Sequence, residues 1–160
     1  NRTSAAILKG NESPEQLESL AHDVFLYFGL GCRNVTKIYV PRGYDFIPVI
    51  NAFKKYNYLA DNNKLKNNYD YNLALHIINS KFYMSTDSLL LVENESLFSP
   101  ISQLHYEFYD DEKKLAEALR LQEDLQCIVG NGYIPFGKAQ VPAIDDFADG
   151  VDTMKFLCSL

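Results

Sequence analysis

The chain has 160 residues, 47% of them hydrophobic and 22% charged, a composition typical of one globular domain with its own core. The formal net charge is −6 and the Lys and Arg residues are scattered, which argues against nucleic-acid binding. The sequence contains no apolar run of the roughly 20 residues that a membrane span needs, and its three cysteines lack metal-ligand and disulfide-framework spacing. We therefore expect a cytoplasmic protein with no metal site and no membrane span.

The first predicted elements are a short buried strand at residues 5–8 and a helix capped by Ser13, with Gln16 at the capping-box position. Apolar residues then recur at steps of three and four, which predicts one buried helix face; they are Leu17, Leu20, Ala21, Val24, Phe25 and Phe28. Gly29 and Gly31 are expected to end this helix, because glycine readily takes the left-handed conformation of a C-cap.

A strand at residues 36–40 follows Cys32 almost directly. The remaining predictions are helices at residues 44–59, 71–79 and 112–125 and strands at residues 89–92, 101–108 and 127–129. The Asn- and Lys-rich residues 61–68 are expected to be a connection, and Leu121 is expected to face the core. Strands that alternate with helices predict one α/β layered domain over residues 1–160, with a mostly parallel sheet flanked by helices.

Cys32 lies between a helix end and a strand start, next to glycines that let another backbone or a substrate approach. Arg33 and Lys37 could favour the thiolate, the species that attacks a carbonyl. The negative end of the preceding helix dipole acts against it. From the pattern alone, a small buried apolar side chain is the favoured interpretation of Cys32.

Four stretches, in this order and spacing, resemble the aldehyde dehydrogenase superfamily and cover nearly all of the chain. They are the turn, helix, cysteine and strand of residues 8–40, Glu95-Ser96-Leu97-Phe98-Ser99-Pro100-Ile101, Pro135-Phe136-Gly137-Lys138, and Ala148-Asp149-Gly150-Val151-Asp152-Thr153. The closer match is to the acyl-CoA reductase branch, which includes the luminescence fatty-acid reductases; it is carried by Phe28-Gly29-Leu30-Gly31-Cys32-Arg33-Asn34 and by Phe136-Gly137-Lys138-Ala139-Gln140 together with residues 148–153.

The resemblance implies an aldehyde-dehydrogenase-like catalytic domain in which Cys32 is the catalytic nucleophile. It also implies that Phe98 and Phe136 flank a nicotinamide, and that Ser96 stands where many relatives have a Glu that contacts the nicotinamide ribose. The cofactor, NADPH or NADH, would be bound mainly by a nicotinamide-binding half that this sequence lacks, so the chain is expected to be part of a longer enzyme. Leu8 stands where hydrolytic relatives have a general-base Glu, which favours acyl exchange with CoA over hydrolysis.

The function implied is reduction of an acyl-CoA substrate to an aldehyde through an acyl thioester on Cys32. Two alternatives stay open: a Cys-dependent acyl transferase or thioesterase without nicotinamide, and a non-catalytic folding or oligomerisation fragment. A homodimer is expected by analogy with the family.

The other polar and thiol side chains are given structural interpretations. Cys127 and Cys158 are expected to be buried, unreactive thiols. The three histidines are expected to be structural or surface residues. Asp145, Asp146, Asp149 and Asp152 are expected to cap helices or to be solvated.

Overall fold

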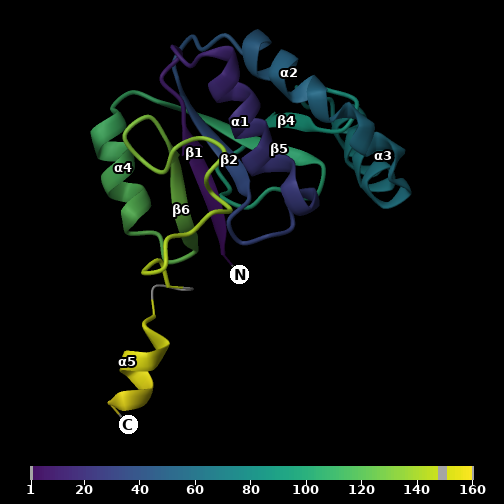
Figure 1. Ribbon diagram of the computed structural model, residues 1–160. Coiled ribbons are helices and arrows are strands. Elements are labelled where there is room, and N and C mark those ends of the chain that lie inside the picture. Colours follow the sequence, from purple (N-terminus) through teal and green to yellow (C-terminus); the bar gives the residue numbers. More distant parts are fainter. Residues whose placement is uncertain (1, 148–150, 160) are drawn as a thin grey trace.

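The computed structural model describes residues 2–147 and 151–159 and confirms the α/β prediction. A six-stranded sheet has the order β3-β4-β5-β2-β1-β6, and its neighbours are parallel except for the antiparallel pair β3 and β4 (Figure 1). The strands are β1 (Thr3–Ile7), β2 (Val35–Pro41), β3 (Met84–Ser85), β4 (Leu90–Glu93), β5 (Gln103–Tyr109) and β6 (Leu125–Gly130). The α-helices are α1 (Pro14–Phe25), α2 (Ile47–Phe53), α3 (Asn63–Ile78), α4 (Glu112–Arg120) and α5 (Thr153–Cys158).

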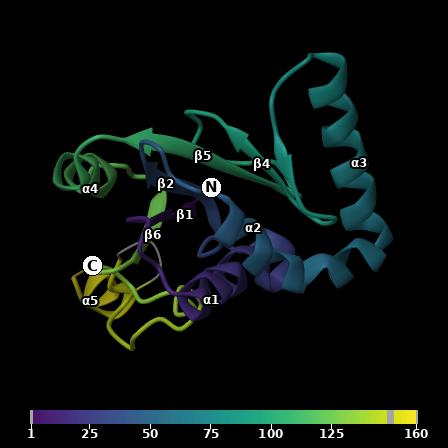
Figure 2. The ribbon, with the colours of Figure 1, turned by 90° about the horizontal axis from the view of Figure 1, so that it is seen from above.

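Helices cover both faces of the sheet, with α1 and α2 on one face and α4 on the other (Figure 2). Successive strand residues point to opposite faces. Accordingly, Ile38 and Val40 of β2 pack in the main core with α1 and α2, whereas Tyr39 packs with Ala116 of α4. The third helix shares the α4 face, where Tyr69 packs with Val92 of β4.

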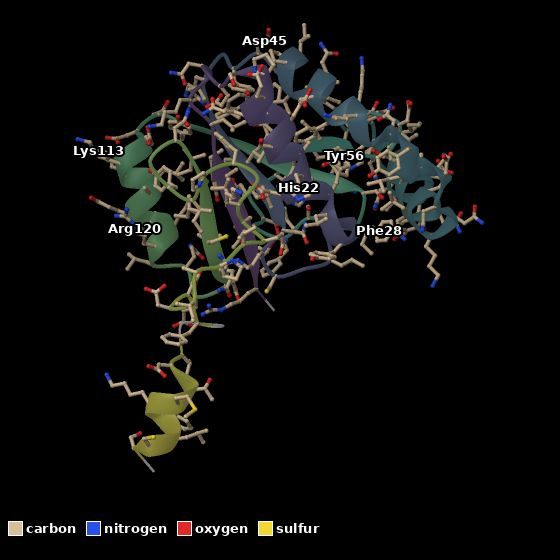
Figure 3. The ribbon with its side chains drawn as sticks, in the orientation of Figure 1. His22, Phe28, Asp45, Tyr56, Lys113 and Arg120 are labelled. Carbon is tan, nitrogen blue, oxygen red and sulfur yellow. The ribbon has the colours of Figure 1, made fainter. Side chains whose placement is uncertain are left out.

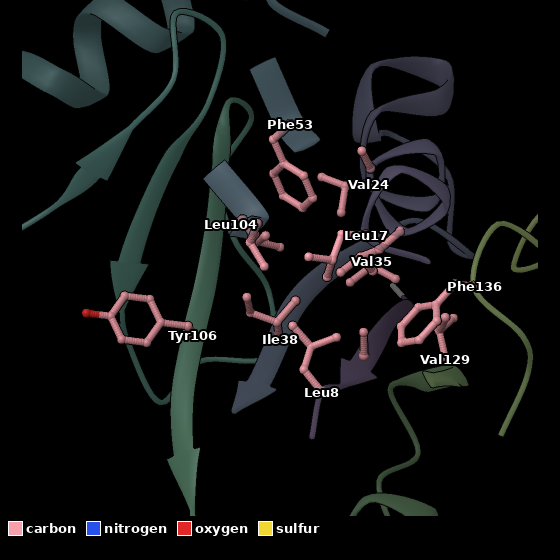
Figure 4. Packing of buried hydrophobic residues seen from close by; sticks show 14 of the residues in the cluster. Leu8, Leu17, Val24, Val35, Ile38, Phe53, Leu104, Tyr106, Val129 and Phe136 are labelled. Atoms are coloured by element: carbon pink, nitrogen blue, oxygen red, sulfur yellow. The ribbon is translucent and has the colours of Figure 1, made fainter. Parts of the chain in front are cut away.

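The start of α1 is as the sequence predicts. The N–H of Gln16 donates to the Ser13 hydroxyl at 3.3 Å, and the Gln16 side chain accepts the N–H of Ser13 at 2.9 Å, which completes the capping box. The apolar face of α1 is buried in the main core, shown from close by in Figure 4, where Leu17 and Val24 are labelled. Burial of each such side chain stabilises the fold by about 1.5–3 kcal/mol.

The end of α1 differs from the prediction. The α-helix stops at Phe25, and a short 3₁₀ turn, η1 (Leu26–Gly29), follows. Tyr27 and Phe28 have left-handed backbones, with φ of 54° and 58°, so the helical path breaks before the glycines are reached. The predicted place of Phe28 in the buried stripe is therefore wrong, and its side chain is 45% exposed (Figure 3).

The predicted bounds of two further segments, between residues 44 and 68, were wrong. The predicted helix at residues 44–59 is the shorter α2 followed by a 3₁₀ segment, η2 (Lys54–Asp61). The expected connection at residues 61–68 is instead the first part of α3, because the Asn62 side chain caps that helix by accepting two backbone N–H groups. Strand β3 and helix α5 were not predicted.

Helix α4 ends at Arg120, five residues earlier than predicted. Leu119 is buried against the sheet, but Leu121 lies beyond the helix and is 84% exposed, so the expectation that it faces the core is wrong. The last helix, α5, lies apart from the sheet (Figure 1), and the Asp152 carboxylate caps it by accepting the N–H of Lys155. Among the described residues, no helix is both long and apolar enough to cross a membrane.

Candidate functional site

Cys32 lies in the tight turn that joins η1 to β2, and its side chain is exposed. The N–H of Asn34 donates to the carbonyl oxygen of Gly31 at 2.9 Å, which places Cys32 and Arg33 at the centre of a four-residue turn. Neither central residue has a positive φ, so the turn is type I. No hydrogen bond within residues 2–147 and 151–159 uses the N–H of either central residue. Two adjacent donors therefore remain beside the thiol.

The Asn34 side chain is completely buried and forms hydrogen bonds to both this turn and the end of α1. Its Oδ1 accepts the N–H of Gly31 at 2.8 Å. Its Nδ2 contacts the carbonyl oxygens of Asp23, Val24 and Leu26 at 2.9, 3.2 and 2.8 Å. One amide thus caps the carbonyl end of the helix and fixes the first N–H of the turn.

A second contact joins the same turn to residues 137–139. The Arg33 guanidinium donates to the carbonyl oxygen of Ala139 and pairs with the Asp146 carboxylate at 2.7 Å. The buried Asp23 carboxylate accepts the N–H groups of Gly137 and Ala139 at 2.6 and 3.1 Å. Burial raises the pKa of Asp23, and these two hydrogen bonds act against that rise. The acidic residue at 146 is therefore an ion-pair partner as well as a surface residue.

Gln140 follows this segment and lies near the Cys32 turn. Its Nε2 atom is 3.7 Å from the position that a Cβ would take on Gly31. This nitrogen is buried and has no hydrogen-bond partner in the described part of the chain. The Gln140 amide therefore presents a side-chain donor at the edge of the candidate site.

Residues 94–99 cross the sheet face that carries α4 and contain the predicted cofactor residues Ser96 and Phe98. Three side chains of the sheet hold the backbone of this segment: Thr36 Oγ1 donates to Leu97 O at 2.8 Å, Lys37 Nζ to Glu95 O at 2.6 Å, and His105 Nδ1 lies 2.9 Å from Ser96 O. The Ser96 hydroxyl donates to the carbonyl oxygen of Phe98 at 3.0 Å. The segment is therefore fixed to the sheet, although Ser96 itself is exposed.

A cavity of about 210 Å³ lies at the edge of the sheet where the parallel strands begin. Thr3, Val35 and Gln103, the first residues of three strands, line it. Gly31 and Phe98 line the same cavity, and Phe98 is 37% exposed. The structure therefore brings the Cys32 turn and one predicted cofactor residue to a common cavity.

Phe136 lies elsewhere. Its ring is 9% exposed and packs in the main core beneath α1, near Val129 (Figure 4). It lines a separate pocket with Gln16 and Asn131 at the opposite edge of the sheet, where β6 ends. The structure does not bring Phe136 to the cavity that Gly31 and Phe98 share.

Leu8 also lies away from the candidate site. It follows β1 and is fully buried in the main core, whereas Cys32 precedes β2. Because β1 and β2 are parallel, the two positions are at opposite edges of the sheet, separated by a five-residue strand of about 16 Å. The residue at position 8 therefore has no bearing on hydrolysis at Cys32.

The other two thiols differ from each other. Cys127 is buried, as predicted, with its Sγ 3.0 Å from the Ser4 hydroxyl, and burial raises the pKa of its thiol. Cys158 in α5 is exposed, so the expectation of a buried thiol is wrong there. Apolar neighbours such as Phe156 and Leu157 are exposed in the same way, because α5 packs on nothing in the described structure.

The histidines and acidic residues form no metal site among the residues that the structure describes. His22 Nδ1 lies 3.3 Å from the Tyr56 hydroxyl on the surface (Figure 3). His105 is buried, and burial lowers its pKa. Asp149 lies outside the described residues.

The sequence did not single out Asp23 or the anchoring role of Asn34. For Asn34 a signal was available, because asparagine side chains in tight turns often bond to nearby backbone groups. Asp23 had no comparable signal, since its two partners are more than 110 positions away. No protein-family model matches the chain, and no curated protein matches it.

Proposed function

We propose that the chain carries the acyl-accepting thiol of an NAD(P)H-dependent acyl-CoA reductase, with Cys32 as the nucleophile. The observation that carries this proposal is the exposed Cys32 thiol on an anchored turn, whose first residue, Gly31, lines a cavity together with Phe98. An accessible thiol on a rigid turn meets the requirement for covalent catalysis that a buried cysteine does not.

In the first stage, the thiolate of Cys32 attacks the carbonyl carbon of an acyl-CoA. A bond forms between the cysteine sulfur and this carbon, and the bond from the carbon to the CoA sulfur breaks. Free CoA leaves and takes up a proton equivalent to the one that the cysteine gave to solvent. Negative charge develops on the acyl oxygen during this exchange, so hydrogen-bond donors beside the thiol accelerate it. The N–H of Cys32, which has no hydrogen-bond partner among the described residues, is suited to this role.

The residues of the candidate site fit a nicotinamide in part. Phe98 supplies an exposed aromatic face at the cavity that Gly31 lines, whereas the Ser96 hydroxyl already donates to the Phe98 carbonyl and Phe136 lies in the core. A reduced nicotinamide, when bound, supplies the hydride that converts the acyl thioester to an aldehyde and returns the thiol. The contribution of this chain is to hold the acyl group on Cys32 and to present Phe98 at the cavity that Gly31 also lines.

The acylation stage is testable on this chain, because it needs only the thiol and the donors beside it. We would incubate the chain with acetyl-, butyryl- and octanoyl-CoA without nicotinamide and measure adducts by intact-protein and peptide-mapped mass spectrometry. We expect one acyl group at Cys32, which is lost in Cys32→Ala. Cys158→Ser is the matched control, because it removes the other exposed thiol and leaves the adduct in place. Adducts at Cys158 alone, or none with any acyl-CoA, would overturn the proposal.

A further inference from the structure

We propose that Asn34 is a positioning residue for acyl transfer, which holds the turn so that the N–H groups of both Cys32 and Arg33 can bind the acyl oxygen. This inference rests on the proposed function of Cys32. It assigns a role to a side chain that does not touch the substrate and adds the N–H of Arg33 as a second donor.

The Asn34 side chain contacts four backbone groups around the turn and the end of α1. Asn34 Oδ1 occupies the N–H of Gly31, and its Nδ2 reaches three carbonyl oxygens at the end of α1. Its backbone N–H closes the turn onto the carbonyl oxygen of Gly31. Together these bonds satisfy the groups at the base of the turn. In the described part of the chain, no hydrogen bond uses the N–H groups of Cys32 and Arg33.

The Asn34 amide also changes the charge around the thiol. Carbonyl oxygens at a helix C-terminus carry partial negative charge, which opposes an anion nearby. Acyl transfer needs negative charge on the attacking sulfur and then on the acyl oxygen. The two amide hydrogens of Asn34 are shared among three of these carbonyl oxygens and offset part of their charge. The carbonyl oxygen of Cys32 is in turn held by the Ser4 hydroxyl at 3.2 Å.

Gly31 has no space for a side chain beside the Asn34 amide. A Cβ built on Gly31 would lie 2.9 Å from Asn34 Oδ1, closer than such atoms approach in proteins. Gly31 has no positive φ, so the backbone conformation does not require glycine here. The close approach of the Asn34 amide does require it.

The test compares two reactions of the same thiol, measured by mass spectrometry at Cys32 in a Cys158→Ser background. Acyl transfer from octanoyl-CoA develops negative charge on a carbonyl oxygen, whereas alkylation by iodoacetamide occurs at a saturated carbon and develops no such charge. Loss of an oxyanion donor slows acyl transfer about 100-fold or more in other enzymes. We expect Asn34→Ala to slow acyl transfer by about 100-fold and alkylation several-fold at most.

Two further variants keep the test decisive. Gly31→Ala retains every hydrogen-bonding group but displaces the Asn34 amide, and we expect the same selective loss of acyl transfer. If Asn34→Ala does not fold, as judged by circular dichroism, Gly31→Ala decides the question. Asn72→Ala is the matched control: it removes another buried asparagine, whose Nδ2 donates to Ile101 O at 2.9 Å, and is expected to leave both rates unchanged.

The outcomes separate this inference from the proposed function. If the parent chain is acylated but the variants lose acyl transfer and alkylation in equal proportion, or lose neither, then Asn34 has only a structural role and the inference is wrong. If the parent chain is never acylated although iodoacetamide reacts with Cys32, the proposed function itself fails.

Discussion

The buried carboxylate of Asp23 holds together two parts of the chain that are distant in sequence, and its removal tests the architecture of the candidate site. Asp23→Ala removes the acceptor of two backbone N–H groups, at Gly137 and Ala139. Ala139 is fully buried, so its N–H cannot turn to water, whereas Gly137 is partly exposed. A buried donor without a partner costs about 1–3 kcal/mol, and a hydrogen bond to a charged group contributes about 1.5–3 kcal/mol.

The desolvation of the carboxylate, which raises the pKa of Asp23, offsets part of this loss. We therefore expect Asp23→Ala to lower the free energy of unfolding by about 2–3 kcal/mol, which corresponds to a fall in Tm of roughly 5–10 °C for a chain of this size. Asp23→Asn retains one acceptor oxygen but turns an amide N–H₂ toward the second donor, and should cost about half as much.

The assay is urea unfolding followed by circular dichroism, with thermal unfolding as a second measure. Asp45→Ala is the control, because Asp45 is exposed and its carboxylate accepts only the nearby N–H of Ile47; its cost should stay below about 1 kcal/mol. A loss below about 0.5 kcal/mol in Asp23→Ala would refute the reasoning, since it would mean that this carboxylate does not hold residues 137–139.

Four further predictions concern pH, backbone strain, packing and thiol reactivity. Burial lowers the pKa of His105 below 6.5, so the neutral imidazole stabilises the folded chain fully above pH 6.5, and this stabilisation is lost as the pH falls. The free energy of unfolding should therefore drop between pH 7 and 5, by at most about 1.4 kcal/mol per pH unit. His105→Gln should make the free energy of unfolding depend less on pH over this range. Gly137→Ala should destabilise the chain more than Gly132→Ala in thermal melts, because both have a positive φ but only the first places a Cβ against Ser19, at 3.1 Å. In urea titrations, Leu119→Ala should lower the free energy of unfolding by about 2–4 kcal/mol, because Leu119 is buried. Leu121→Ala should lower it by less than about 0.5 kcal/mol, because Leu121 is exposed. Equal losses would mean that α4 presents a different face to the sheet. Native alkylation should label Cys32 and Cys158 but spare the buried Cys127 until urea is added, and rapid labelling of all three would contradict the burial of Cys127.

The features of the fold that could be predicted from the sequence are those that depend on residues close together in the chain. The capping box at Ser13 and Gln16 and the apolar stripe of α1 depend only on residues a few positions apart, so the pattern identifies them. The alternation of strands and helices predicted the α/β class for a similar reason. The predicted end of the α1 helix was wrong because Tyr27 and Phe28 take left-handed backbone conformations that their residue types do not favour.

The candidate site was predictable only in its separate pieces. The sequence places Cys32 between a helix and a strand, and the structure adds that Phe98 and Gly31 line one cavity while Phe136 lies in the core. No local pattern distinguishes an aromatic ring at a cavity from one in a core, because both satisfy the same hydrophobic requirement.

By itself, then, the sequence determined the elements whose stabilising contacts lie within one or two helical turns, and the place of a thiol between a helix end and a strand start; the exposure of that thiol came from the structure. Only the tertiary structure decided what anchors that thiol. The Asp23 carboxylate accepts the N–H groups of residues 137 and 139, Arg33 pairs with Asp146, and the Asn34 amide donates to carbonyl oxygens at the end of α1. The first two contacts join residues more than 110 positions apart, and their energies depend on burial that arises only when the sheet and helices have packed. A hydrogen bond that is weak in water becomes costly to lose in that interior, which is why these polar residues decide the geometry around Cys32.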